Sequence, residues 1–134
     1  MKELIALYRQ KLLEADSTLV PCPVFMIHQE GEVPFPPRAV DEHLLHMMTK
    51  MPGMYDGAFD TDIPDFYDPD AMMKFNRWLG FIQGVLWLKG TYTLNQLRDQ
   101  TRAAVARMAV EADQKAAEEL QRHKRRNMQL TGAD

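Results

Sequence analysis

The chain has 134 residues, which is the length of one domain, or of one domain with an extension, and is enough to bury one hydrophobic core. Its 46% of hydrophobic and 26% of charged residues are typical of an ordinary soluble globular protein. The single cysteine, Cys22, excludes an internal disulfide, and the longest apolar stretch, within 79–88, is too short for a transmembrane helix. The N-terminal residues lack the continuous apolar run of a signal peptide.

The net charge of −3 hides an uneven distribution. Residues 1–70 carry 5 Lys and Arg against 13 Asp and Glu, whereas residues 71–134 carry 11 against 6. Such polarity either organises an intramolecular contact or steers a partner. The uneven distribution also follows if acidic loops simply precede a basic helix end, with no role in an intramolecular contact or in partner binding.

The first half of the chain predicts two helices joined by a proline-rich segment. Residues 2–15 place apolar side chains largely on one helical face. The prolines between 18 and 37 forbid a regular helix there and predict an extended arm against the core, a place where partner contacts are common. A second helix is expected over 38–50, ended by Met51-Pro52-Gly53.

Residues 53–69 are expected to form a long loop in which acidic and aromatic residues alternate. Acidic and aromatic alternation is typical of an interacting surface, and also of a loop anchored by its aromatic side chains. Aromatic residues tend to dominate interfaces. The predicted partner-binding residues are Tyr55, Phe59, Asp60, Asp62, Phe66 and Tyr67.

The strongest local signals predict a helical hairpin over residues 69–127. Asp68 and Pro69 are suited to begin a helix that runs to residue 89, and Gly90 is suited to end it. Thr93 and Gln96 then match a capping box for a helix over 94–127.

The first helix of this hairpin is apolar nearly all round, which predicts a central helix covered on most sides. Gly80 and Gly84 share one of its faces, and their cost in helix stability suggests that a neighbouring helix approaches closely there.

The apolar face of the last helix thins after Met108. We therefore expect a helical domain over 1–108 and a projecting helical extension with a basic end over 109–134. A second copy of the chain, forming a homodimer, or another partner would hold such an extension.

Together these elements predict a small all-α domain built on a central helical hairpin, with a Pro-rich extended arm and a long C-terminal helix. The expected core residues are Leu4, Tyr8, Leu12, Leu44, Phe75, Leu79, Ile82, Leu86 and Leu97.

Catalytic and metal-binding signals are weak throughout the chain. Cys22, His28, His43 and His46 suit zinc by type but not by spacing, and the aspartates between 60 and 70 fail the calcium-loop pattern. No nucleophile elbow or phosphate-binding glycine loop is present. The sequence therefore favours a non-catalytic protein without a metal or another cofactor.

The basic cluster near the C-terminus offers an alternative function. Arg122, Lys124, Arg125 and Arg126 would contact phosphates in a nucleic acid, or would interact favourably with the end of their own helix.

The stretches RWLGFIQGVLW and GTYTLNQLRDQTR, within residues 74–102, resemble small accessory proteins from the early regions of temperate, lambda-like bacteriophages of enteric bacteria. The resemblance implies a cytoplasmic protein of an infected cell that binds a host enzyme or defence complex and inhibits or redirects it. It assigns no functional residue.

Overall fold

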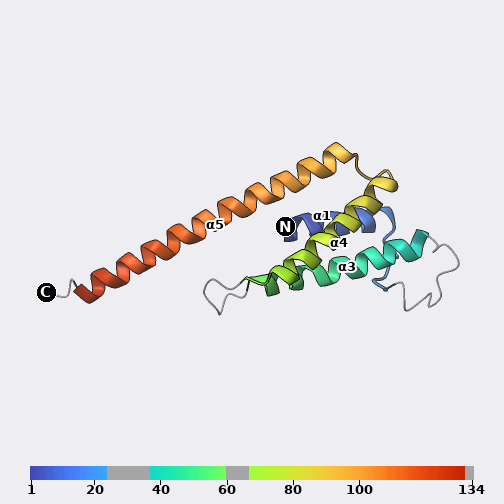
Figure 1. Cartoon of the computed structure of the whole chain (residues 1–134). Helices are drawn as coiled ribbons and strands as arrows, with labels where there is room; N and C mark the ends of the chain where they lie inside the picture. The colour runs from blue at the N-terminus through green and yellow to red at the C-terminus, as the bar shows by residue number, and fades with distance from the viewer. Residues whose placement is uncertain (24–36, 60–66, 132–134) are drawn as a thin grey trace.

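The computed structural model describes residues 1–23, 37–59 and 67–131, and these ranges contain four α-helices and no strand. The helices are α1 (Lys2–Ala15), α3 (Pro37–Ala58), α4 (Pro69–Leu88) and α5 (Leu94–Thr131). The all-α prediction is confirmed. Figure 1 shows α1, α3 and α4 gathered into one body, from which α5 extends so that its C-terminal end lies far from the other helices.

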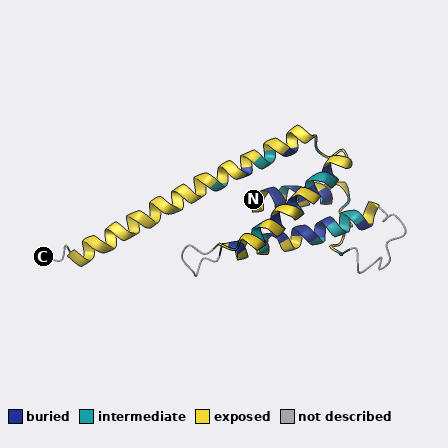
Figure 2. Cartoon of the chain, viewed as in Figure 1, coloured by how far each residue is buried: buried dark blue, intermediate teal, exposed yellow. Residues whose placement is uncertain are grey.

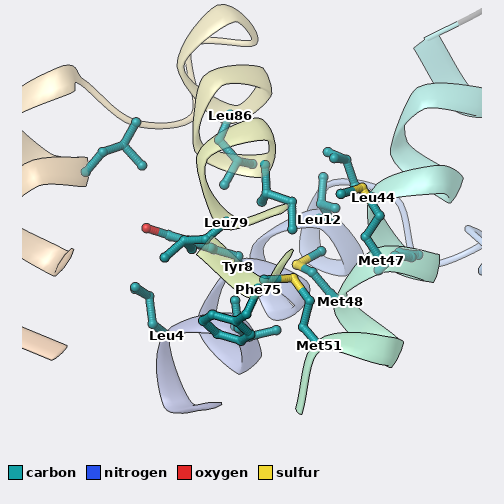
Figure 3. Packing of buried hydrophobic residues seen from close by; sticks show 14 of the residues in the cluster. Leu4, Tyr8, Leu12, Leu44, Met47, Met48, Met51, Phe75, Leu79 and Leu86 are labelled. Carbon is teal, nitrogen blue, oxygen red and sulfur yellow. The ribbon is translucent and has the colours of Figure 1, made fainter. Parts of the chain in front are cut away.

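The core lies between α1, α3 and α4, and α5 contributes to it only near its start. Helices α3 and α4 pack against each other, and α1 packs against α3. In Figure 3, Phe75 and Leu79 of α4 meet Met48 and Met51 of α3 beside Tyr8 of α1. Every residue predicted for the core is buried. The methionines of α3 are a further part of it, because their flexible side chains fill irregular gaps.

The predicted ends of α4 are confirmed in detail. The Asp68 carboxylate accepts hydrogen bonds from the backbone N–H groups of Asp70 (3.0 Å) and Ala71 (3.3 Å), and Pro69 is the first helical residue. At the other end Gly90 has φ +75°, and its N–H donates to the Trp87 carbonyl (2.9 Å). A left-handed glycine is the usual way to close a helix, since other residues are strained there.

The predicted capping box of α5 is also confirmed. The Thr93 hydroxyl accepts from the Gln96 N–H (3.1 Å), and the Gln96 side chain accepts from the Thr93 N–H (2.9 Å). The central hairpin itself is not confirmed, because the main partner of α4 is α3, and α5 contacts both α1 and α4.

Helix α3 is longer than predicted. It runs through Pro52 and Gly53 to Ala58, so the end expected at residue 50 is wrong and the loop expected over 53–69 begins later. Met51 and Ala58, on either side of the expected break, are both fully buried. Burial of these side chains outweighs the hydrogen bond that Pro52 cannot donate and the low helix propensity of Gly53.

The prediction that α4 is covered on most sides is wrong. Its inner face is buried, but Met73, Phe81, Trp87 and Leu88 are exposed large apolar residues. The glycines lie on this outer side: no atom of another described residue comes within 4 Å of where a Cβ would stand on Gly80 or Gly84. The close helix approach predicted at these glycines is therefore wrong for the described part of the chain.

The start of the proline-rich segment lies along the first turns of α3. Arg38 donates to the Thr18 carbonyl (2.9 Å), and Glu42 accepts from the Val20 N–H (2.9 Å). Leu19 is buried. These contacts place residues 18–23 beside α3. The Pro-rich arm as predicted is not confirmed, because its remainder lies outside the described residues.

A half-buried polar network joins α1, α4 and α5. The Tyr8 hydroxyl donates to the Gln100 side-chain oxygen (3.0 Å) and accepts from the Gln83 amide (3.1 Å). Gln83 also donates to the Thr101 hydroxyl (2.7 Å). Burial raises the pKa of Tyr8, which keeps its hydroxyl protonated and able to donate. The network fixes the side of α5 that faces the body.

The contact of α5 with the body continues past this network to Ala104 and Met108 and then ends. Leu97 and Ala104 are the buried residues of α5, and every residue from 109 to 131 is exposed, as Figure 2 shows. The helix ends at Thr131, a few residues beyond the predicted end at 127.

We predict that Leu79→Ala or Ile82→Ala lowers the free energy of unfolding by about 2–5 kcal/mol, because each deletes a buried aliphatic side chain and leaves a cavity. Thr93→Ala should cost only about 1 kcal/mol, the typical value for an N-cap. Urea denaturation measures all three, with Leu88→Ala as an exposed control. Equal, negligible losses at positions 79, 82 and 93 would contradict the assigned core.

We also predict that Tyr8→Phe costs about 1–2 kcal/mol, because it removes the hydroxyl that partners Gln83 and Gln100. Tyr92→Phe is the matched control: the Tyr92 hydroxyl is buried and has no hydrogen-bond partner among the described residues. Its removal should be neutral or stabilising. The prediction fails if the two variants have the same unfolding midpoint in urea.

Candidate partner-binding surface

Aromatic side chains form a continuous series from the core to the surface where α3 ends and α4 begins. The Tyr55 ring lies 5.5 Å from that of the fully buried Phe75 and 5.3 Å from that of Phe59, and the Phe59 ring lies 5.4 Å from that of Tyr67. All three pairs are tilted, a favourable arrangement for aromatic quadrupoles. We call Tyr55, Phe59 and Tyr67 the aromatic cluster.

The outer members of the aromatic cluster are accessible. Phe59 is 39% and Tyr67 51% exposed, whereas Tyr55 is half-buried. The backbone around them is tied together, since the Asp68 N–H donates to the Ala58 carbonyl (2.9 Å) and the Phe59 N–H to the Asp56 carbonyl (3.2 Å). Two exposed rings are thus held on a connection whose ends are hydrogen-bonded to each other.

Charged side chains border the aromatic cluster. Lys2 of α1 donates to the Asp56 carboxylate (2.9 Å), and this hydrogen bond raises the pKa of Lys2. Burial raises the pKa of Tyr55, and the negative charge of Glu111 on α5 raises it further. The cluster therefore lies beside the contact between the start of α1 and the end of α3.

The structure brings together three of the six predicted partner-binding residues: Tyr55, Phe59 and Tyr67. Tyr55 belongs to α3 and not to a loop, because the helix continues past Pro52. Asp60, Asp62 and Phe66 lie outside the described residues.

The exposed outer face of α4 was not predicted. The nearly continuous apolar sequence of α4 predicts cover on most sides. The four core positions predicted on α4 are the buried ones, but its other apolar residues gave no sign that they would stay exposed. A further hollow of about 590 Å³ lies between α1 and α3. Its lining mixes apolar residues such as Ile5 and Met48 with charged ones such as Arg9.

The basic residues proposed for nucleic acid lie elsewhere. Arg122, Lys124, Arg125 and Arg126 are exposed near the C-terminal end of α5, remote from the body (Figure 2). No ion pair involves any of them within the described ranges.

Two of the histidines that suit zinc by type do lie together on α3. The His43 and His46 rings are 6.2 Å apart, and Phe81 of α4 meets His43 edge-on at 6.4 Å. No group of three or more metal-ligating side chains occurs among the residues that the structure describes. His28 lies outside them, and Cys22 is half-buried beside α3, where its N–H donates to the Glu42 carbonyl (3.1 Å).

Comparison with family models, with curated proteins and with solved structures finds no match for this chain. Within the described ranges, none of the helices combines the length and the apolar character needed to cross a bilayer.

We predict that His43 titrates below the ordinary histidine pKa of about 6.5, because burial disfavours its charged form and the neighbouring His46 adds repulsion. A lowered pKa in the folded state means that the unfolded chain binds the proton more readily. The contribution of His43 to stability is therefore complete above about pH 6.5 and is lost as the pH falls through that value.

NMR titration of the histidine ring protons measures this directly, and His46→Asn should raise the His43 midpoint. Urea unfolding between about pH 7.5 and pH 5.5 should show a decline in stability that is smaller in His43→Gln. A His43 midpoint at or above about 6.5 would contradict the prediction.

Proposed function

We propose that the chain is a non-catalytic protein-binding module that docks a partner through the aromatic cluster. The observation that carries the proposal is the ring series from buried Phe75 through Tyr55 to exposed Phe59 and Tyr67. An exposed ring that is already held by its neighbours loses little conformational entropy on binding, which is one reason why aromatic residues dominate interfaces.

The chemistry of the cluster indicates the kind of partner. Two adjacent rings require an apolar pocket, and Asp56 next to them, with Asp60 and Asp62 following in sequence, favours a basic rim around that pocket. A protein with such a surface is the partner we propose.

The proposal extends to biological role through the resemblance to phage accessory proteins. In that setting the chain acts in the cytoplasm of an infected bacterium, where it binds a host enzyme or defence complex and inhibits or redirects it. This extension rests on the resemblance alone, and the docking surface does not depend on it.

An affinity pull-down from bacterial lysate, with and without nuclease treatment, tests the proposal. We expect a protein partner whose recovery survives nuclease and falls at least about tenfold when Phe59 and Tyr67 are both changed to Ala, the loss expected of interface anchors. Phe81→Ala is the matched control, since Phe81 and Tyr67 are both 51% exposed. Undiminished recovery with the double variant would contradict the proposed docking surface.

The second candidate function is nucleic-acid binding by the end of α5. The four basic side chains named above are exposed and carry no ion pair within the described ranges, which leaves them available to phosphates. The same pull-down separates the candidates: a nuclease-sensitive complex that weakens steeply with salt, and is lost when all four residues are changed to Gln, supports this one.

A further inference from the structure

The exposed part of α5, residues 109–131, is amphipathic in a way that its contacts with the body do not use. Viewed down the helix axis, Val110, Leu120, Met128 and Leu130 fall on one side of it. All four are more than half exposed. We call this side of residues 109–131 the α5 outer face. Ala109, Ala112, Ala116 and Ala117 lie on it as well, and so do the polar residues Asp113, His123, Lys124 and Asn127.

The α5 outer face does not continue the face that packs on the body. Leu97, Thr101 and Ala104 face the body, and the helical repeat places Leu120 about a third of a turn away from them. Within residues 109–131, the positions on the same helical face as those three residues are charged. They include Glu111, Lys115, Glu119, Arg122 and Arg126. A second helix can therefore cover the α5 outer face without displacing α5 from its own body.

The charges along the exposed part of α5 are separated into two segments. Residues 111–119 contain four acidic side chains and one basic one, and residues 122–126 contain four basic side chains and no acidic one. Two such helices repel each other when parallel and in register, because the basic segments coincide. Arranged antiparallel, each acidic segment lies beside the basic segment of the other copy.

The length of the exposed part of α5 is compatible with the same antiparallel arrangement. Residues 109–131 span about 35 Å, and full antiparallel overlap of two copies places their shared midpoint at Leu120. In that register residues 111–119 of one copy lie opposite residues 121–129 of the other, which include the basic segment. Full overlap of the exposed parts therefore also brings the acidic segment of each copy beside the basic segment of the other.

We propose that α5 pairs antiparallel with α5 of a second copy of this chain, through the α5 outer face and about a two-fold axis at Leu120. Leu120 of one copy packs on Leu120 of the other. Val110 of each copy lies beside Met128 of the other, and Ala112 beside Leu130, so small and large side chains alternate along the contact. Such an interface is isologous and closes as a dimer.

This proposal is independent of the aromatic cluster, which occupies a different surface. The apolar contacts centred on Leu120 contribute to the affinity, and the charged segments set the orientation of the two helices, since single surface ion pairs contribute little. The basic segment is then an element of dimer pairing as well as the candidate phosphate-binding site.

Sedimentation equilibrium of the nuclease-treated full chain tests the dimer. We expect a monomer–dimer equilibrium whose dissociation constant rises at least about tenfold in Leu120→Glu, which places two carboxylates at the two-fold axis. Leu88→Glu is the matched control: Leu88 is 79% exposed but lies on α4, and its change should leave the equilibrium unaltered. Circular dichroism checks that both variants stay helical.

Disulfide trapping in a Cys22→Ser background tests the orientation. Val110→Cys alone and Met128→Cys alone should not cross-link, because in the antiparallel pair a cysteine at 110 is roughly 30 Å, and one at 128 roughly 24 Å, from its equivalent in the other copy along the helix axis. A mixture of the two variants should give a disulfide-linked dimer on mild oxidation.

Three results would overturn the proposal. One is a wild-type chain that is monomeric at every concentration. The second is a dimer that Leu88→Glu dissociates and Leu120→Glu does not. The third is cross-linking of each cysteine variant with itself, which would show a parallel pair.

Discussion

The direction of α5 depends on the hydrogen bonds that the hydroxyl group of Tyr8 makes. The tyrosine ring is fully buried in the core, and a buried hydroxyl without hydrogen bonds is costly. Its partners come from two other helices, Gln83 of α4 and Gln100 of α5. Because Gln83 also holds Thr101, the same few atoms set the face of α5 that lies on the body. The direction in which the rest of α5 leaves the body follows from that contact.

Two surfaces follow from this arrangement, and they differ in chemistry. The aromatic cluster is anchored in the core through Phe75 and so presents rigid rings beside the body. The exposed part of α5 presents alanines and a few larger apolar residues between segments of opposite charge. The first suits a pocket on another protein, and the second suits a copy of itself. Taken together, the two proposals describe a dimer in which each copy offers one aromatic cluster to a partner protein.

Much of the fold could be predicted because its signals are local. The Asp68 cap, the Gly90 terminus and the Thr93–Gln96 capping box each involve residues within a few positions of one another, so their hydrogen bonds follow from the sequence itself. The core residues of α1 and α5 were recognisable for a similar reason, since apolar side chains at helical spacing define a face. Of the candidate site, Tyr55, Phe59 and Tyr67 could be proposed from the sequence as partner-binding residues, but not their order from the core outward, which requires the position of Phe75.

The sequence by itself therefore determined where most helices begin and end and which side chains are apolar enough to be buried. Only the tertiary structure decided that α3 continues through Pro52, because the burial of Met51 and Ala58 comes from packing against other elements. It also decided that Met73 and Phe81 of α4 stay exposed, because an apolar face is buried only where another helix arrives to cover it. Local propensity acts over one or two helical turns, whereas cover depends on helices distant in sequence, and that difference in range separates what could be predicted from what could not.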